Sequence, residues 1–111
     1  MSTRAEITIR NHYEALSFYR HQDGFPEGAL PTLKQFMARV RSGEIRDNPS
    51  QAAGWLIIIG HEEYAESRAE YAFNRWKVGA YEPSAGGHGD TEYGYVLDLD
   101  KMTIEVWKLN R

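Results

Sequence analysis

The chain has 111 residues, a formal net charge of −3, 41% hydrophobic residues and no cysteine. The missing cysteines exclude a disulfide framework, a thiolate metal site and a thiol nucleophile, and the mildly acidic balance argues against binding of duplex nucleic acid, which needs a surplus of Lys and Arg. The length suits a single domain over residues 1–111. Because the sequence shows neither a signal peptide nor an apolar run of membrane-spanning length, we expect a cytoplasmic protein that does not enter a membrane.

The first part of the chain alternates polar and apolar residues, which is the period of a half-buried strand. This pattern predicts strands over Glu6–Arg10 and Ala15–His21, and the short polar segment between them would join the two as a β-hairpin. Gly24, Pro26 and Gly28 then break the sheet.

Two helices are expected next. Pro31 is suited to the first position of a helix, and apolar residues at helical spacing continue from it to a stop at Gly43. Asn48 and Pro49 predict the N-cap and first residue of a second helix, which would run over Gln51–Ile59. The apolar run in that segment could also form a buried strand, but the cap favours a helix.

The second half of the chain predicts three more strands. Residues 62–75 indicate the end of the second helix followed by a loop, and a loop rich in Pro and Gly is expected over Glu82–Gly89. The strands are expected at Trp76–Tyr81, Glu92–Asp98 and Met102–Leu109. The order ββααβββ predicts an α+β fold, in which an antiparallel sheet of about five strands packs against two helices.

Two turns carry the same His-x-Asp pattern, formed by His21, Asp23, His88 and Asp90. If the two turns lie side by side, these groups could bind zinc, manganese or iron, or act as acid and base on a phosphate or glycosidic bond. Arg4 or Arg20 would then bind phosphate. The alternative is that each Asp only shapes its turn by bonding nearby backbone N–H groups.

Aromatic residues are concentrated in the second half of the chain and include Tyr81, Tyr93 and Trp107. On alternating strands some of them must face away from the helices. Exposed Tyr and Trp beside Arg are typical of protein-recognition surfaces, although an antiparallel sheet also favours aromatic residues for packing alone.

Several segments together resemble a group of small uncharacterised proteins of phages and prophages. The most specific of them is the Y-R-H-x-D-G-x-P string within Tyr19–Gly28. The others are Thr3–Ile7, Gly54–Ile57, Trp76–Pro83 and His88–Asp90. The resemblance implies an accessory gene of a mobile element in a bacterial host, and it assigns no catalytic residue.

Two functions are compatible with these observations. The first is an anti-defence protein, similar to an anti-CRISPR inhibitor, that binds a host defence complex in the bacterial cytoplasm as a monomer or a homodimer and needs no cofactor. Its expected binding residues are Arg4, Arg20, His21, Asp23, Tyr81, His88 and Tyr93. The second is a small hydrolase of a nucleotide or phosphodiester, using the two His-x-Asp turns and, if needed, a divalent metal.

Overall fold

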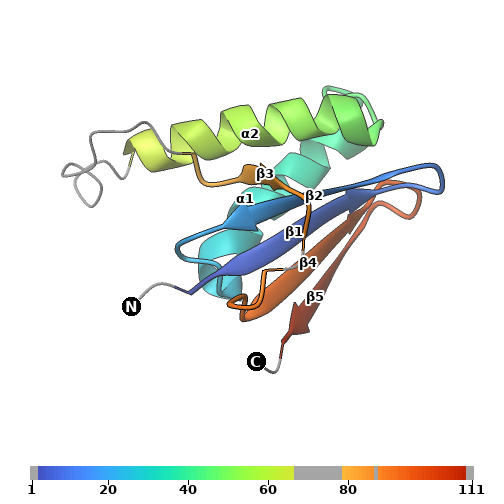
Figure 1. The fold of residues 1–111 in the computed structure, drawn as a ribbon. Coiled ribbons are helices and arrows are strands. Elements are labelled where there is room, and N and C mark those ends of the chain that lie inside the picture. Colours follow the sequence, from blue (N-terminus) through green and yellow to red (C-terminus); the bar gives the residue numbers. More distant parts are fainter. Residues whose placement is uncertain (1–2, 67–78, 87, 110–111) are drawn as a thin grey trace.

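The computed structural model describes residues 3–66, 79–86 and 88–109, and its elements follow the expected order (Figure 1). The two helices are α1 (Pro26–Arg41) and α2 (Pro49–Glu66). The five strands are β1 (Ala5–Arg10), β2 (Ala15–Arg20), β3 (Glu82–Ser84), β4 (Tyr93–Asp98) and β5 (Thr103–Lys108). The predicted α+β fold is therefore confirmed. Within the described residues, neither helix is long and apolar enough to cross a membrane.

The sheet has the strand order β3-β2-β1-β4-β5. Three of its four pairings are antiparallel, as predicted, and the central pairing of β1 with β4 is parallel. A parallel pairing needs a long crossover connection, which the two helices between β2 and β3 provide. The N-terminal strand therefore lies at the centre of the sheet.

Both helices pack on one face of the sheet, as Figure 1 shows, and the opposite face carries no helix in the described part of the chain. Alternate residues of the central strands, such as Ile7, Phe18 and Leu97, point to the helices and are buried. They form one core with Phe36 of α1 and Leu56 of α2. We call the uncovered side the open face.

Helix α1 begins at Pro26, not at Pro31 as predicted. The turn that precedes it explains the difference. Asp23 has a φ of 56°, a left-handed conformation that Asp tolerates, and it reverses the chain early. Gly28 then packs so closely on this turn that an added Cβ would lie 2.5 Å from the Asp23 carbonyl oxygen. Pro26 therefore occupies the first helical position, and Pro31 lies inside the helix.

The remaining helix signals are confirmed. Helix α1 ends at Arg41, and Gly43 follows with a φ of 88°, which favours glycine. The Asn48 side chain accepts a hydrogen bond of 3.1 Å from the backbone N–H of Gln51, as an N-cap should. The segment that could have been a buried strand belongs to α2, which continues to Glu66, within the residues 62–75 where its end was expected. Residues 67–75, the rest of the predicted loop, lie outside the described residues.

The strand predicted at Trp76–Tyr81 is wrong for residues 79–81. Residues 79–81 are not in a strand, and residues 76–78 lie outside the described residues. The third strand is instead β3, inside the segment that was expected to be a loop. β3 is at the edge of the sheet, where Pro83 removes no interior hydrogen bond. Tyr81 is buried beside α2, because its neighbour Ala80 donates a backbone hydrogen bond to the Gly60 carbonyl.

Candidate functional site

Tyr19 lies at the centre of a group of polar side chains on the open face. The strand register places it in line with Glu6 of β1 and Glu82 of β3, facing away from the helices. Only 3% of Tyr19 is exposed, because the chain after β3 returns over it. The His88 ring stacks on the phenol with the ring centroids 4.0 Å apart, and the His21 ring meets it edge-on at 4.5 Å.

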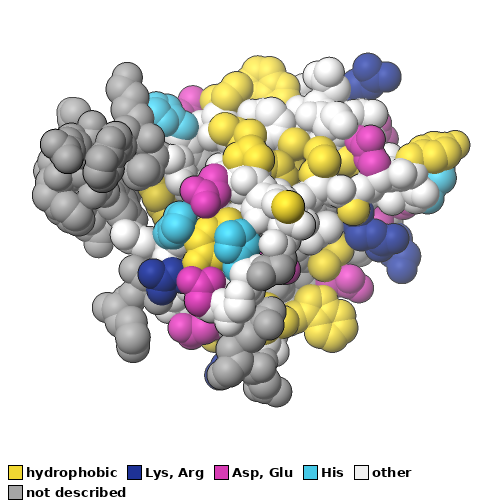
Figure 2. Space-filling model, viewed as in Figure 1, with side chains coloured by type: hydrophobic (Ala, Val, Ile, Leu, Met, Phe, Trp, Pro, Cys, Tyr) yellow, Lys and Arg dark blue, Asp and Glu magenta, His cyan; other side chains and the backbone are white. Residues whose placement is uncertain are grey.

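Hydrogen bonds and ion pairs connect the side chains around Tyr19. The Tyr19 hydroxyl donates to Asp90 at 2.7 Å, and the same carboxylate pairs with Arg4 at 3.2 Å. Figure 2 shows histidine side chains near the middle of this view, with acidic and basic side chains beside them. We call the group the Tyr19 cluster; its members are Arg4, Tyr19, His21, Glu82, Ser84, His88 and Asp90.

Each histidine of the cluster has its own polar partner on β3. His21 Nε2 lies 3.2 Å from the Glu82 carboxylate, and His88 Nε2 forms a hydrogen bond of 2.6 Å with the Ser84 hydroxyl. Ser84 also accepts the backbone N–H of Gly86 at 3.0 Å. Chemically, the two imidazoles could exchange protons with a ligand on the open face, and Ser84 could supply a hydroxyl.

Burial and the hydrogen bond to Asp90 raise the pKa of Tyr19 to about 12. The same bond lowers the pKa of Asp90, which the nearby Arg4 guanidinium also lowers. The pair is therefore a neutral phenol and an ionised carboxylate throughout the neutral pH range.

The structure thus brings together His21, His88 and Asp90 from the two His-x-Asp turns, but not Asp23. β2 ends at Arg20, so the expected alternation does not continue to Asp23, which shapes the turn into α1 through its left-handed conformation. The alternative interpretation, in which Asp23 only shapes its turn, agrees with this position. No three His, Asp or Glu side chains of the described residues are grouped as a metal site would require.

Three other expected binding residues lie away from the open face. Arg20 is fully buried on the helix side, where it pairs with Glu63 of α2, so it is not placed to bind phosphate at the surface. Tyr81 is buried with its ring centroid 5.1 Å from the Arg20 guanidinium. Tyr93 is half-buried and packs against the core. The alternation of β2 placed Arg20 on the face opposite Tyr19, but nothing in the pattern showed that this face is the one covered by the helices.

Glu82, Ser84 and the central role of Tyr19 were missed in the sequence. Glu82 and Ser84 are polar residues on either side of the apolar Pro83, and this alternation could have indicated a short edge strand. Tyr19 was recognised as a strand residue, but only the pairing of β2 with β1 and β3 shows that the two turns meet over its ring.

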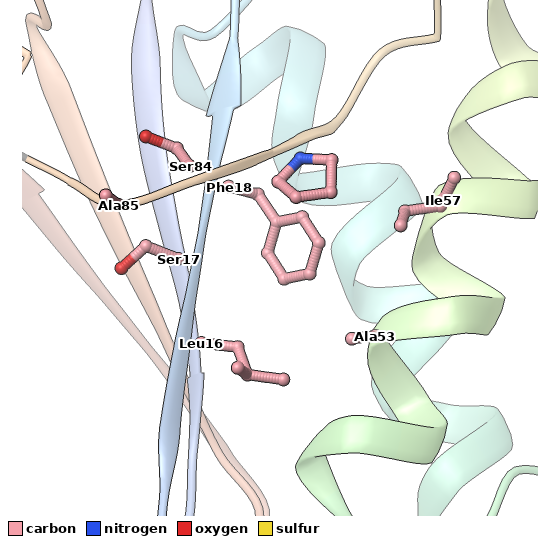
Figure 3. Close-up of a pocket in the computed structure, with 8 residues that line it drawn as sticks. Leu16, Ser17, Phe18, Ala53, Ile57, Ser84 and Ala85 are labelled. Atoms are coloured by element: carbon pink, nitrogen blue, oxygen red, sulfur yellow. The ribbon is translucent and has the colours of Figure 1, made fainter.

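An apolar groove of about 450 Å³ lies at the edge of the sheet, between β2, β3 and α2. Figure 3 shows Leu16 and Phe18 on the side of α2, opposite Ala53 and Ile57, whereas Ser17 and Ser84 point to the other side of the sheet. The groove is therefore separated by the strands from the Tyr19 cluster.

A second exposed feature of the open face is Trp107 of β5, of which 57% is exposed. Trp107 pairs with Gly94 of β4, and Gly94 pairs with Glu6 of β1. Tyr19 and Trp107 thus belong to one row across four strands, and the strand spacing separates them by roughly 14 Å. Gly94 has no side chain, and the Leu109 methyls and the Trp107 Cβ lie 3.9 Å from the place that its Cβ would occupy.

Comparison of the chain with protein-family models, with curated proteins and with solved structures finds no match.

The pKa of Tyr19 gives a prediction for alkaline pH. At pH 8 we expect Tyr19→Phe to lower the free energy of unfolding by about 1 kcal/mol, the net value of a typical hydrogen bond, because the Asp90 carboxylate is half exposed. Because the folded-state pKa is raised from its ordinary value near 10, this contribution is complete below pH 10 and is lost as the pH rises through about 12. Urea unfolding should therefore show a smaller difference in unfolding free energy between wild type and Tyr19→Phe at pH 11 than at pH 8.

Tyr13→Phe, at a residue 85% exposed, is the control. An equal difference at both pH values would contradict the assignment.

Proposed function

We propose that the protein acts by binding another protein through the open face of its sheet. The observation that carries this proposal is Trp107, a large aromatic side chain more than half exposed on a face that no described helix covers. Trp is among the residues most often found as the central anchor of a protein interface. The Leu109 methyls lie over Gly94 beside Trp107 and extend the apolar surface that a partner side chain would contact.

The Tyr19 cluster supports the same proposal as the polar part of the contact surface. Its carboxylates, imidazoles and guanidinium are held in place by one another, through Tyr19 and the β3 strand. Groups that are already ordered lose little conformational freedom on binding. Of the binding residues expected from the sequence, Arg4, His21 and His88 belong to this surface.

The partner we propose to test first is a defence complex of a bacterial host, which the protein would inhibit in the manner of an anti-CRISPR protein. This choice rests on the resemblance of the Tyr19–Gly28 segment to phage and prophage proteins. Inhibition by occupation of a surface needs neither a cofactor nor an active site.

A second proposal, acid–base hydrolysis of a nucleotide or phosphodiester, is favoured by one observation. His21 and His88 contact the same phenol ring, so two proton-transfer groups lie on one surface with Arg4 nearby. Glu82 and Asp90 weaken this proposal, because carboxylates beside the imidazoles repel a phosphate.

Two substitutions separate the proposals. We expect Trp107→Ala to lower partner binding by about 2 kcal/mol or more, as for a hot-spot residue, while Tyr13→Ala, at the exposed β1–β2 turn, leaves it unchanged. Affinity capture from host lysate with each variant, followed by mass spectrometry, measures this. His88→Ala, at the polar part of the contact surface, should weaken capture less than Trp107→Ala under the binding proposal, and should abolish turnover of bis(p-nitrophenyl) phosphate under the hydrolase proposal. Capture of the same proteins by wild type and Trp107→Ala would refute binding through the open face. Circular dichroism confirms that each variant is folded.

A further inference from the structure

The open face carries uncompensated negative charge around Trp107. Glu105 lies two residues before Trp107 on β5 and so on the same face, and Glu6 lies across Gly94 in the same row of the sheet. Glu92 is exposed and precedes the first residue of β4. Because that residue, Tyr93, packs against the core on the helix side, Glu92 lies on the open face. Among the described residues, none of these three carboxylates has an ion-pair or hydrogen-bond partner.

The basic residues of this face do not offset that charge. Arg4 is paired with Asp90 at 3.2 Å, and Arg10 is paired with Asp98 at 2.9 Å. Each pair is neutral as a whole. Among the residues that the structure describes, two lysines remain near the sheet. Lys108 lies on the helix side of β5, next to Trp107, and Lys101 lies in the β4–β5 turn.

We propose that the open face binds a basic protein surface, with a Lys or Arg side chain of the partner placed beside Trp107. The inference rests on the proposed function and adds the chemistry of the partner. An exposed indole attracts a cation to its face, and three unpaired carboxylates around it favour a positively charged surface over an acidic one. A nucleic acid is excluded as the occupant by the same charge complementarity, because its phosphates would be repelled.

The geometry of the row gives this contact a specific form. Gly94 lies between Glu6 and Trp107, and strand spacing puts the Cα atoms of these two residues about 10 Å apart. Above Gly94, the nearest groups to an added Cβ are the Leu109 methyls and the Trp107 Cβ, all at 3.9 Å. The apolar stem of a long basic side chain would lie on this surface, with its charged end at a carboxylate.

The test uses a short capped peptide that alternates glycine and arginine, titrated into the full chain and followed by NMR. We expect shifts at the Trp107 indole, Gly94 and Glu105, and none with the matching glycine–glutamate peptide. The triple variant Glu6→Gln/Glu92→Gln/Glu105→Gln should weaken arginine-peptide binding about tenfold. The matched control is a triple variant that removes the same charge from exposed positions off the open face: Glu27→Gln/Asp47→Asn/Glu62→Gln.

Each result has a defined meaning. Loss of affinity in the first triple variant but not in the control supports the proposal. Equal loss in both, equal binding of the two peptides, or shifts confined to other surfaces would overturn it. If Trp107→Ala abolishes capture of the host partner while the first triple variant retains it, the basic-partner inference fails and the proposed function stands. If neither variant affects capture, the proposed function itself fails.

Discussion

Replacing Glu63 with Ala is expected to destabilise the protein by about 3–5 kcal/mol. Glu63 of α2 is the charged partner of Arg20, whose side chain is only 1% exposed. The Glu63 carboxylate accepts hydrogen bonds from the guanidinium and from the Thr32 hydroxyl of α1 at 2.9 Å. Without it a buried positive charge remains with no compensating anion among the described residues, and that penalty is much larger than the net value of the pair.

Urea unfolding at pH 7 measures this effect against two controls. Glu44→Ala breaks the Arg39–Glu44 pair, in which both side chains are more than a third exposed, and should cost less than about 1 kcal/mol. The double variant Arg20→Met/Glu63→Met removes both charges and should regain most of the loss, because apolar replacement of a buried pair is often neutral. If Glu63→Ala costs no more than Glu44→Ala, the buried pair does not have the role that its geometry indicates.

Two glycines of α2 should respond in opposite ways to the same substitution. A Cβ at Gly60 would lie 2.6 Å from the ring of buried Tyr81 and 3.1 Å from the Tyr81 backbone nitrogen. Relief of that clash would move the segment that leads into β3. We therefore expect Gly60→Ala to cost about 1–3 kcal/mol, although alanine is the better helix former.

Gly54→Ala is the matched control in the same helix. No atom outside the local backbone lies within 4 Å of the added Cβ, so only the helix propensity changes, and stability should rise by up to about 1 kcal/mol. Thermal unfolding of both variants in dilute solution checks the pair. A gain in stability at both positions would show that Tyr81 and its neighbours move aside without cost.

The sequence predicted the fold well where one local interaction decides the structure. Asn48 followed by Pro49 marks the start of α2, because a side-chain cap and a proline at the first position act within a few residues. Gly43 marks the end of α1 for a similar local reason. The start of α1 was misplaced because two prolines compete for the first position, and the left-handed turn at Asp23 that selects Pro26 is not visible in the pattern.

The candidate site depended on contacts between distant segments and was predicted only in part. The alternation of β2 correctly separates Tyr19 from Arg20, but it does not show that Arg20 lies buried under α2 with Glu63. The meeting of His21 and His88 over Tyr19 requires β3 to return beside β2, which depends on the register of an edge strand of only three residues. Short edge strands leave a weak sequence signal because few alternating positions define them.

The parallel pairing at the centre of the sheet has a consequence for synthesis on the ribosome. Arg10 of β1 and Asp98 of β4 are joined by an ion pair across 88 positions of the chain. When the β1–β2 hairpin leaves the ribosome, the inner edge of β1 has no neighbour until Asp98, 88 positions after Arg10, has followed it. Closing so long a loop is slow, so the nascent hairpin presents unpaired backbone groups until β4 pairs with it, and a chaperone that shields this edge should raise the yield of folded protein.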